Sequence, residues 1–401
     1  MLQVLPLEDA IALICDHARK MKAGASQKPL SDAAGLVLAE DAIADADLPA
    51  FDRSAVDGFA VFAADTFGAD AAQPALLRLA GEVRMGERAD FDVGAGTCGA
   101  VWTGGALPSG ADAAVMLEET ELLPGGLVAI ESSAAPGRHV VFRGDDARAG
   151  QTLLPKGKRL SARDIGLLAA FGFARVSVLE TPRVAILSTG DELIDPAETP
   201  TGAKVRDING PMLAAACEAA GAKARFWGRI PDDEGQLLDA MQEAGKECDL
   251  LLLSGGSSAG AKDAAARCLR KLGRMLFHGL ALKPGKPAFA GVIGETLVIG
   301  LPGHPAAAYL VFHTLVKPAL AALAGETLRV KTSSAVLTQA VPSNHGREEL
   351  LLVRLAGGKA EPLPSKSGLV RPLTLAEGYV RIPRDTEGFP EGARVDVVLF
   401  E

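Results

Sequence analysis

The sequence predicts a multi-domain α/β plus β protein, and three observations carry this prediction. The chain has 401 residues, which is enough for two to four domains of roughly 100–200 residues each. From residue 182 onward, short aliphatic runs alternate with helical stretches, which is the pattern of a doubly wound, mainly parallel sheet. Residues 50–140 and the segment after 326 instead carry short apolar runs broken by Gly, Asp and Pro, which is typical of strands and turns.

Changes in sequence texture place the expected domain boundaries. We assign an N-terminal linker domain to residues 1–46 and 141–181, and an inserted β-rich domain to residues 47–140. The α/β domain is assigned to residues 182–325, and a C-terminal domain resembling a β-barrel to residues 326–401.

Hydrophobic spacing predicts the main elements. Residues 7–22 repeat apolar side chains on one face of an amphipathic helix, and residues 164–172 form a helix that ends at a glycine. In the α/β region the runs VAIL, LLLL and LVIG are typical of parallel strands that are buried on both faces. Helices are expected at 209–221 and 233–245, and Asn209 is a candidate N-cap for the first of them.

Composition and charge exclude several classes of protein. The formal net charge of −9 argues against bulk electrostatic binding to nucleic acid or to anionic lipid, so we expect neither as a partner. Five cysteines without a C-x-x-C pair encode neither a disulfide framework nor a zinc site, and free thiols fit a cytoplasmic location. The N-terminus lacks the basic residues of a signal peptide. The uncharged stretch 296–316 is interrupted by Gly and Pro, so we predict a strand, a turn and a buried helix in place of a membrane span.

Three glycine-bearing polar loops follow the predicted parallel strands. In an open parallel sheet, ligands bind outside the carboxyl ends of the strands, and small residues let backbone N–H groups approach phosphate oxygens. One such loop is explained equally well as an ordinary turn, but three at one edge predict a site for a small, anionic, phosphate-bearing ligand. The candidate binding residues are Ser188, Thr189, Gly190, Gly255, Gly256, Ser257, Pro302, Gly303, His304 and Pro305.

Two lysines lie close together on a stiff bend, in the sequence Lys283-Pro284-Gly285-Lys286-Pro287. Neighbouring ammonium groups repel each other, so presenting them together favours an anionic partner. We expect both ammonium groups to face the loops at 188–192 and 254–263. The alternative is a solvated surface turn.

Carboxylates cluster near the same loops, at Asp191, Glu192, Asp232 and Asp263. Oxygen ligands of this kind suit Mg²⁺, which usually accompanies phosphate, and we assign Asp191, Glu192 and Asp263 as the metal-binding candidates. Each carboxylate alone is explained equally well as a helix cap or a partner of a helix dipole.

Six ordered sequence blocks resemble the molybdopterin molybdenumtransferase (MoeA) family, to which the C-terminal enzyme domain of gephyrin also belongs. The blocks are PAFDRSAVDGFAV at 49–61, TGGALPSGADA at 103–113, STGDEL at 188–193, SGGS at 254–257, KPGKP at 283–287 and LPGHP at 301–305. The resemblance departs from the family's usual pattern at Val56, where Met is common, and at His304, where Asn is common. His304 adds a titratable group near an anion.

The resemblance implies that molybdate is inserted into adenylyl-molybdopterin and that AMP is released, with Mg²⁺ as cofactor. It implies a MogA-like α/β domain and a homodimer, in which the block around Asp57 reaches the α/β domain of the other subunit. It also implies as partners other proteins of molybdenum cofactor biosynthesis and the acceptor molybdoenzymes. By motif position, the catalytic candidates are Asp57, Thr103, Glu192, Asp263, Lys283 and Lys286, and the substrate-binding candidates include Asp146, Asp232, Pro302, Pro305 and Ser367.

Two other functions stay open at this point. A molybdopterin adenylyltransferase shares the α/β domain but normally consists of that domain alone, whereas this chain adds some 250 further residues. A non-catalytic molybdopterin-binding scaffold is the second alternative, and it would be favoured by loss of the carboxylates or of the lysine pair. Both sets of side chains are present in this sequence.

Overall fold

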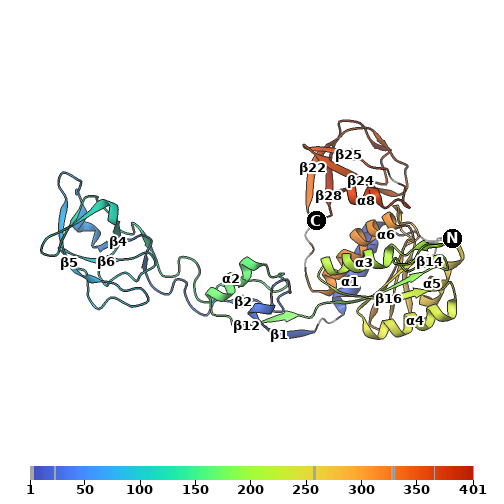
Figure 1. Ribbon diagram of the computed structural model, residues 1–401, viewed down its shortest axis with the longest axis horizontal. Coiled ribbons are helices and arrows are strands. Elements are labelled where there is room, and N and C mark those ends of the chain that lie inside the picture. Colours follow the sequence, from blue (N-terminus) through green and yellow to red (C-terminus); the bar gives the residue numbers. More distant parts are fainter. Residues whose placement is uncertain are drawn as a thin grey trace. The chain divides into compact units, whose positions relative to one another are not determined.

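The structure is a computed structural model that divides the chain into two compact units (Figure 1). The first unit comprises Met1–Ala39, Gly157–Ser161 and Val176–Glu401, and the second comprises Glu40–Lys156 and Ala162–Arg175. The residues described are 4–21, 24–255, 259–326, 328, 330–364 and 366–400, without the side chains of 259–263.

A six-stranded sheet forms the centre of the first unit, in the order β16-β13-β17-β21-β20-β18. The first four strands run parallel, which confirms the predicted parallel sheet. The last two strands pair antiparallel, and the sequence did not indicate them. The strands span β13 Arg183–Thr189, β16 Lys223–Ile230, β17 Leu250–Gly255, β18 Arg274–His278, β20 Phe289–Ile293 and β21 Thr296–Leu301.

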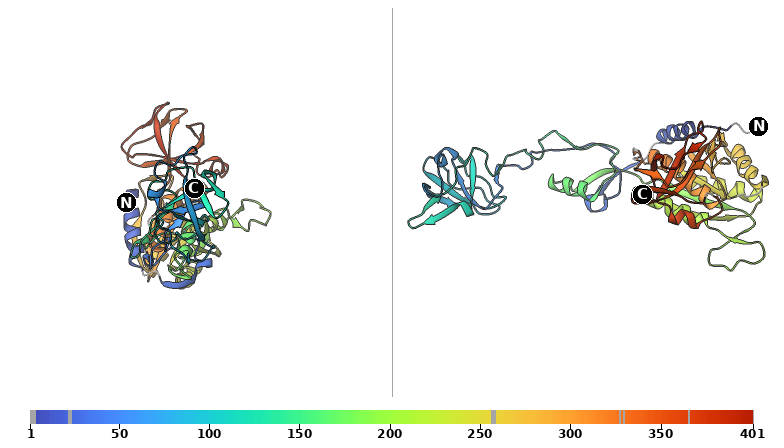
Figure 2. Two further views of the ribbon diagram at one scale, coloured as in Figure 1. Left: turned by 90° about the vertical axis from the view of Figure 1, so that its left-hand side faces the viewer. Right: turned by 90° about the horizontal axis from the view of Figure 1, so that it is seen from above.

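Helices cover both faces of this sheet, so the doubly wound class is confirmed. Figure 1 shows α3 and α6 on one side of the sheet and α4 on the other, and Figure 2 gives two further views. The alternating side chains of each strand explain this layering: Ile186 and Leu252 belong to the core beneath α1 and α3, whereas Leu187 and Leu253 belong to the core beneath α4. The helices span α1 Leu7–Lys20, α3 Asn209–Ala219, α4 Glu234–Glu247, α5 Ala259–Leu272, α6 Pro305–Val311 and α7 Lys317–Leu323.

A single long helical segment joins α6 to α7 through a π-helical turn at Phe312–Val316. By length and composition alone, Pro305–Leu323 is apolar enough to cross a membrane. However, 83% of its most apolar window is buried inside the protein. It is therefore the buried helix that the sequence predicts after the strand at 296–301.

The C-terminal sheet closes on itself, because β26 pairs with both β28 and β24. Its order is β19-β24-β25-β22-β28-β26, and a short strand from the α/β region, β19, joins it in parallel with β24. This barrel agrees with the predicted C-terminal β domain. The strands span β19 Leu282–Lys283, β22 Thr332–Leu337, β24 Glu348–Ala356, β25 Lys359–Pro362, β26 Gly378–Ile382 and β28 Arg394–Leu399.

The second unit contains another six-stranded sheet, in the order β7-β4-β6-β5-β9-β8, as its predicted β-rich composition requires. Its core is small and aliphatic, with Val61, Val115 and Ile130 fully buried. The strands span β4 Gly58–Val61, β5 Ala75–Glu82, β6 Thr97–Val101, β7 Ala113–Met116, β8 Thr120–Leu123 and β9 Leu127–Ile130, and helix α2 spans Ala162–Ala170. The predicted residue boundaries of four domains stay predictions.

Candidate functional site

The carboxyl ends of four parallel strands meet at one edge of the α/β sheet. Ser188 on β13 lies in register with Ser254 on β17, and Ser254 lies in register with Leu301 on β21. The loops after these strands, together with the turn after Ile230 of β16, are therefore neighbours. The strands that precede the three predicted loops therefore end at one edge, as the sequence predicts.

Asn209 ties two of these loops together, and its predicted role as the N-cap of α3 is wrong. Ile208 occupies the cap position, and no side chain there accepts a hydrogen bond. The Asn209 amide instead donates to Ser254 Oγ and to the Gly303 carbonyl, both at 2.8 Å. Because Asn209 is only 7% exposed, these bonds are shielded from water and hold the β17 and β21 loops in register.

Close backbone approach explains a glycine in the middle loop. Gly255 has a φ of +142°, and a Cβ there would lie 1.9 Å from the Thr189 carbonyl oxygen. Any other residue would therefore separate β13 from β17. Gly303 lies against the backbone of Gly255, so the β17 and β21 loops are in direct contact. Gly256 and Ser257 lie outside the described residues.

Several buried polar atoms at this edge have no hydrogen-bond partner among the described residues. They are Ser188 Oγ, Asp207 Oδ2 and Asn209 Oδ1. Buried polar groups are nearly always hydrogen-bonded in folded proteins, so three exceptions close in sequence and structure are unusual. The edge of the sheet therefore has unused hydrogen-bonding capacity.

The predicted carboxylates gather at the β13 and β16 end of the edge. Asp191 Oδ1 accepts the backbone N–H of Asp232 at 3.1 Å, and the Glu192 carboxylate lies over Gly190. Burial, and then the negative charges of Asp191 and Glu192, raise the pKa of Asp232. These carboxylate oxygens are of the ligand type that Mg²⁺ prefers, and the repulsion between the negative charges favours binding of a cation. Among the described residues, however, no three acidic, His or Cys side chains are arranged to hold a metal, and the Asp263 side chain lies outside them.

A cationic cavity of about 210 Å³ lies at the β21 end of the same edge. Lys283 and Lys286 line it, together with Arg347, His304 and Ser367. Ser367 Oγ lies 3.0 Å from His304 Nδ1, so this substrate-binding candidate does reach the LPGHP loop. The sequence did not identify Arg347, which comes from the chain just before β24.

Lys283 of the lysine bend pairs with a carboxylate outside the loops that both lysines were predicted to face. Lys283 Nζ pairs with Glu349 Oε1 of the barrel at 2.8 Å. The loop at 188–192 is absent from the described lining of the cavity. The physical reason is strand order: β17 separates β13 from β21, so the loops after these two strands lie two strand spacings, about 10 Å, apart.

Asp57 and Thr103 form a preorganised pair within the second unit. Asp57 Oδ1 accepts both the backbone N–H and the hydroxyl of Thr103, each at 2.7 Å. These two hydrogen bonds, the backbone one first, hold the pKa of Asp57 below its usual value of 3.8. Asp146 is exposed in the same unit, and its backbone N–H donates to Leu48 at 3.0 Å. Asp57 is thus an ionised, fixed acceptor.

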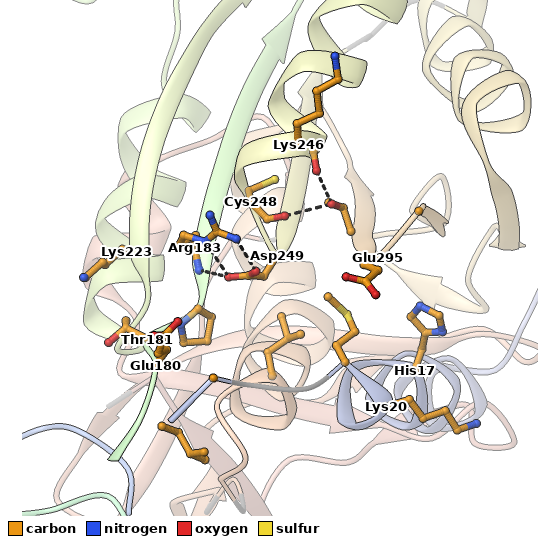
Figure 3. A pocket seen from close by; sticks show the side chains of 18 of the residues that line it. His17, Lys20, Glu180, Thr181, Arg183, Lys223, Lys246, Cys248, Asp249 and Glu295 are labelled. Atoms are coloured by element: carbon orange, nitrogen blue, oxygen red, sulfur yellow. Dashed lines mark hydrogen bonds and ion pairs between the residues drawn. The ribbon is translucent and has the colours of Figure 1, made fainter. Parts of the chain in front are cut away.

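A larger cavity, of about 1360 Å³, lies at the opposite end of the strands (Figure 3). Arg183, Asp249 and Thr296 line it at the points where β13, β17 and β21 begin. Arg183 is already paired with Asp249 at 3.0 Å. No predicted site residue borders this cavity. Because ligands of parallel sheets bind at the carboxyl edge, we place the functional site there despite the smaller volume.

Three family profiles match the chain in order. The "MoeA N-terminal region (domain I and II)" matches residues 5–172, the "Probable molybdopterin binding domain" matches 185–322, and the "MoeA C-terminal region (domain IV)" matches 334–400. The molybdopterin molybdenumtransferase of Bacillus subtilis is 33% identical over 99% of this chain and 94% of its own length. This chain belongs to the molybdopterin molybdenumtransferase (MoeA) family. Molybdopterin molybdenumtransferase 2 of Mycobacterium tuberculosis is 35% identical over 92% of this chain and 93% of its own length.

Solved structures agree with the family assignment. Two crystal structures of the molybdopterin biosynthesis MoeA protein from Pyrococcus horikoshii superpose on essentially the whole chain, with TM-scores of 0.84 and 0.86 and sequence identities of 36% and 32%. They cover 100% and 99% of this chain, respectively, and 100% of their own. The prediction of an enzyme of molybdenum cofactor biosynthesis, a transferase of the MoeA family, is therefore confirmed, and the adenylyltransferase and scaffold alternatives are not favoured.

Proposed function

We propose that this enzyme inserts molybdate into adenylyl-molybdopterin and releases AMP. The observation that carries the proposal is the cavity where Lys283, Lys286 and Arg347 gather at the carboxyl edge of the sheet. At about 210 Å³ it is smaller than the roughly 300–1,000 Å³ pockets that hold drug-sized ligands, so it suits a small ion. Three cationic side chains and the carboxylate of Glu349 leave two positive charges, which match a dianion such as molybdate.

The remainder of the edge suits the phosphates of the substrate. The loops after β13 and β17 turn at Gly190 and Gly255, and the main chain of glycine-bearing loops of this kind is able to offer N–H groups to phosphate oxygens. Ser188 Oγ supplies a buried hydroxyl that can donate a hydrogen bond and has no other partner among the described residues. The separation of about 10 Å between the β13 and β21 loops favours an extended ligand that presents phosphates to one end of the edge and its reacting sulfurs to the other.

The carboxylate cluster is the place where we propose that Mg²⁺ binds. Asp191, Glu192 and Asp232 would hold it, together with Asp263, whose side chain lies outside the described residues. A protein usually holds Mg²⁺ through one or two carboxylates plus substrate phosphates, so a preformed three-carboxylate site is not required. When bound, the ion would neutralise charge on the AMP leaving group. The same carboxylates also keep anions away from this end until a cation is present.

We also propose a homodimer in which the Asp57–Thr103 pair of one subunit completes the site of the other. Asp57 is ionised and fixed, as a group that orients a substrate must be. Mixing subunits tests this arrangement: Asp57→Asn and Lys283→Gln dimers should each keep only a small residual rate, about 10²–10³ below the wild type. A random mixture of the two should recover about a quarter of the wild-type activity. No recovery in verified mixed dimers would contradict a shared site.

The direct test of the function is the release of AMP from adenylyl-molybdopterin when molybdate is added. We expect release with molybdate and none with sulfate, and a loss of about 10²–10³ in rate for Lys286→Gln, because a charge-stabilising group is removed. Lys246→Gln, at the opposite edge of the sheet, is the matched control. Formation of adenylyl-molybdopterin from ATP, without molybdate-dependent AMP release, would instead identify an adenylyltransferase.

The setting of the reaction also belongs to this proposal. We place it in the cytoplasm, where the product passes to acceptor molybdoenzymes with the help of other cofactor-biosynthesis proteins. The acidic net charge of −9 supports protein partners in preference to nucleic acid or a membrane surface.

A further inference from the structure

We propose that Glu349 is a positioning residue for the molybdenum-insertion step, acting through the ammonium group of Lys283. This inference rests on the proposed function, because it takes the cavity lined by Lys283, Lys286 and Arg347 as the molybdate site. Glu349 does not line that cavity. It belongs to β24 of the C-terminal barrel, so the barrel would fix the position of a side chain that the α/β domain provides.

The geometry around Glu349 is that of a fixed clamp. Its side chain is only 8% exposed, and its two oxygens have separate partners. Oε1 lies 2.8 Å from Lys283 Nζ, and Oε2 accepts the hydroxyl of Ser343 at 2.8 Å. The backbones are also tied together, because β19 and β24 pair in parallel with Lys283 opposite Glu349. The carboxylate therefore cannot follow the ammonium group if that group moves.

Burial of this carboxylate argues for a role beyond stability. A buried ion pair contributes little net stability, since desolvation of the charges offsets their attraction. Lys283 itself is 49% exposed and would otherwise sample many rotamers at the cavity wall. Holding its ammonium group in one place lowers the cost of aligning molybdate for transfer. The pair also cancels one positive charge, so Lys286 and Arg347 provide the net attraction for the anion.

The neighbouring residue offers a matched control. Successive side chains on a strand point to opposite faces, and Glu348 accordingly pairs with Arg381, at 2.5 Å, away from the lysine bend. Glu348→Gln removes the same charge from the same strand without touching Lys283. Any effect confined to Glu349→Gln is therefore specific to the lysine clamp.

The experiment combines Glu349→Gln with Lys283→Gln in a double-mutant cycle. Three quantities are measured for each variant: the rate of molybdate-dependent AMP release, the dissociation constant for molybdate alone by calorimetry, and the unfolding temperature. For Glu349→Gln we expect the rate to fall about ten- to hundredfold, because the ammonium group is less firmly held. Molybdate should bind no more weakly, because a negative charge beside the cavity has been removed. In the Lys283→Gln background the same substitution should change the rate less than twofold.

Other results would overturn the proposal. An equal loss of rate from Glu349→Gln with and without Lys283, or the same loss from Glu348→Gln, would show a general structural effect. Weaker molybdate binding without a change in rate would make Glu349 part of the binding site and remove its positioning role. Failure of the proposed function would look different, because the wild-type protein itself would then release no AMP. The calorimetric measurement of molybdate binding would still show whether the cavity binds the anion.

Discussion

Replacing Asn209 tests whether one side chain on α3 holds two substrate loops together. The amide donates to Ser254 Oγ and to the Gly303 carbonyl, both at 2.8 Å, from a position that is 7% exposed. Asn209→Ala removes both bonds. Asn209→Asp keeps the shape of the side chain but places a second acceptor, with a negative charge, against the Gly303 carbonyl oxygen. The aspartate variant should therefore be the more damaging one.

The size of the effect follows from the contacts. Each hydrogen bond contributes about 1 kcal/mol net, and the two partner groups would lose their buried donor. Against this, Asn209 Oδ1 is itself buried without a partner among the described residues, so removing it relieves part of the cost. We expect Asn209→Ala to destabilise the first unit by about 2 kcal/mol. For Asn209→Asp we expect a larger loss, since a charge is buried beside a like partial charge.

Chemical denaturation and the AMP-release assay measure the two consequences. Loosened loops should lower the rate of AMP release about tenfold or more in Asn209→Ala. The aspartate variant also decides between the two roles of this residue. Asp is a favourable residue at a helix N-terminus, so a capping role predicts that Asn209→Asp is neutral or stabilising. An Asn209→Asp protein as stable and as active as the wild type would refute the cross-linking role.

Three further predictions concern charge. The pKa of Asp232 is raised, so its ionisation opposes folding as the pH rises above 3.8. Asp232→Asn should therefore raise the unfolding temperature at pH 7 and not at pH 3, because repulsion from Asp191 is relieved. It should also weaken the dependence of turnover on Mg²⁺, because a proposed metal ligand is lost. The pKa of Asp57 is lowered, so its contacts contribute stability above pH 3.8 that is lost as the pH falls through the pKa of the folded protein. Thr103→Val removes the hydroxyl that donates to Asp57, so the pKa of Asp57 measured by NMR should rise. Arg347→Gln should weaken molybdate binding about tenfold by calorimetry, because a charge-assisted contact is removed.

The parallel sheet and its ligand edge were predictable because they follow from local patterns. Three buried aliphatic strands separated by helical stretches leave few topologies, and parallel connections force the carboxyl ends to one edge. Strands β18 and β20 were not predictable in the same way. Each is five residues long, and they pair antiparallel with each other at one end of the strand order. Neither the period of their apolar residues nor their length distinguishes them from loop sequence.

Arg347 and Glu349 were missed for a different reason. Both come from the sequence GREELLLV, at least 60 residues after the lysine bend, where charged residues before an apolar run are typical of any strand entering a core. Only the pairing of β19 with β24 brings them to Lys283. Such a two-residue strand pairing leaves no hydrophobic period in the sequence, so the contact could be found only in three dimensions.

The lysine bend shows how far a charge argument from sequence extends. Two adjacent ammonium groups do favour an anion, but the sequence cannot say whether the anion is a ligand or a side chain. In the structure Glu349 balances Lys283, and no ion pair is found for Lys286 or Arg347 in the described part of the chain. The inference of an anion site therefore depends on these two cations, which line a cavity with Ser367 and His304, and no longer on the lysine pair alone. A site identified from neighbouring charges is supported only when the structure shows which of them lack a partner within the protein.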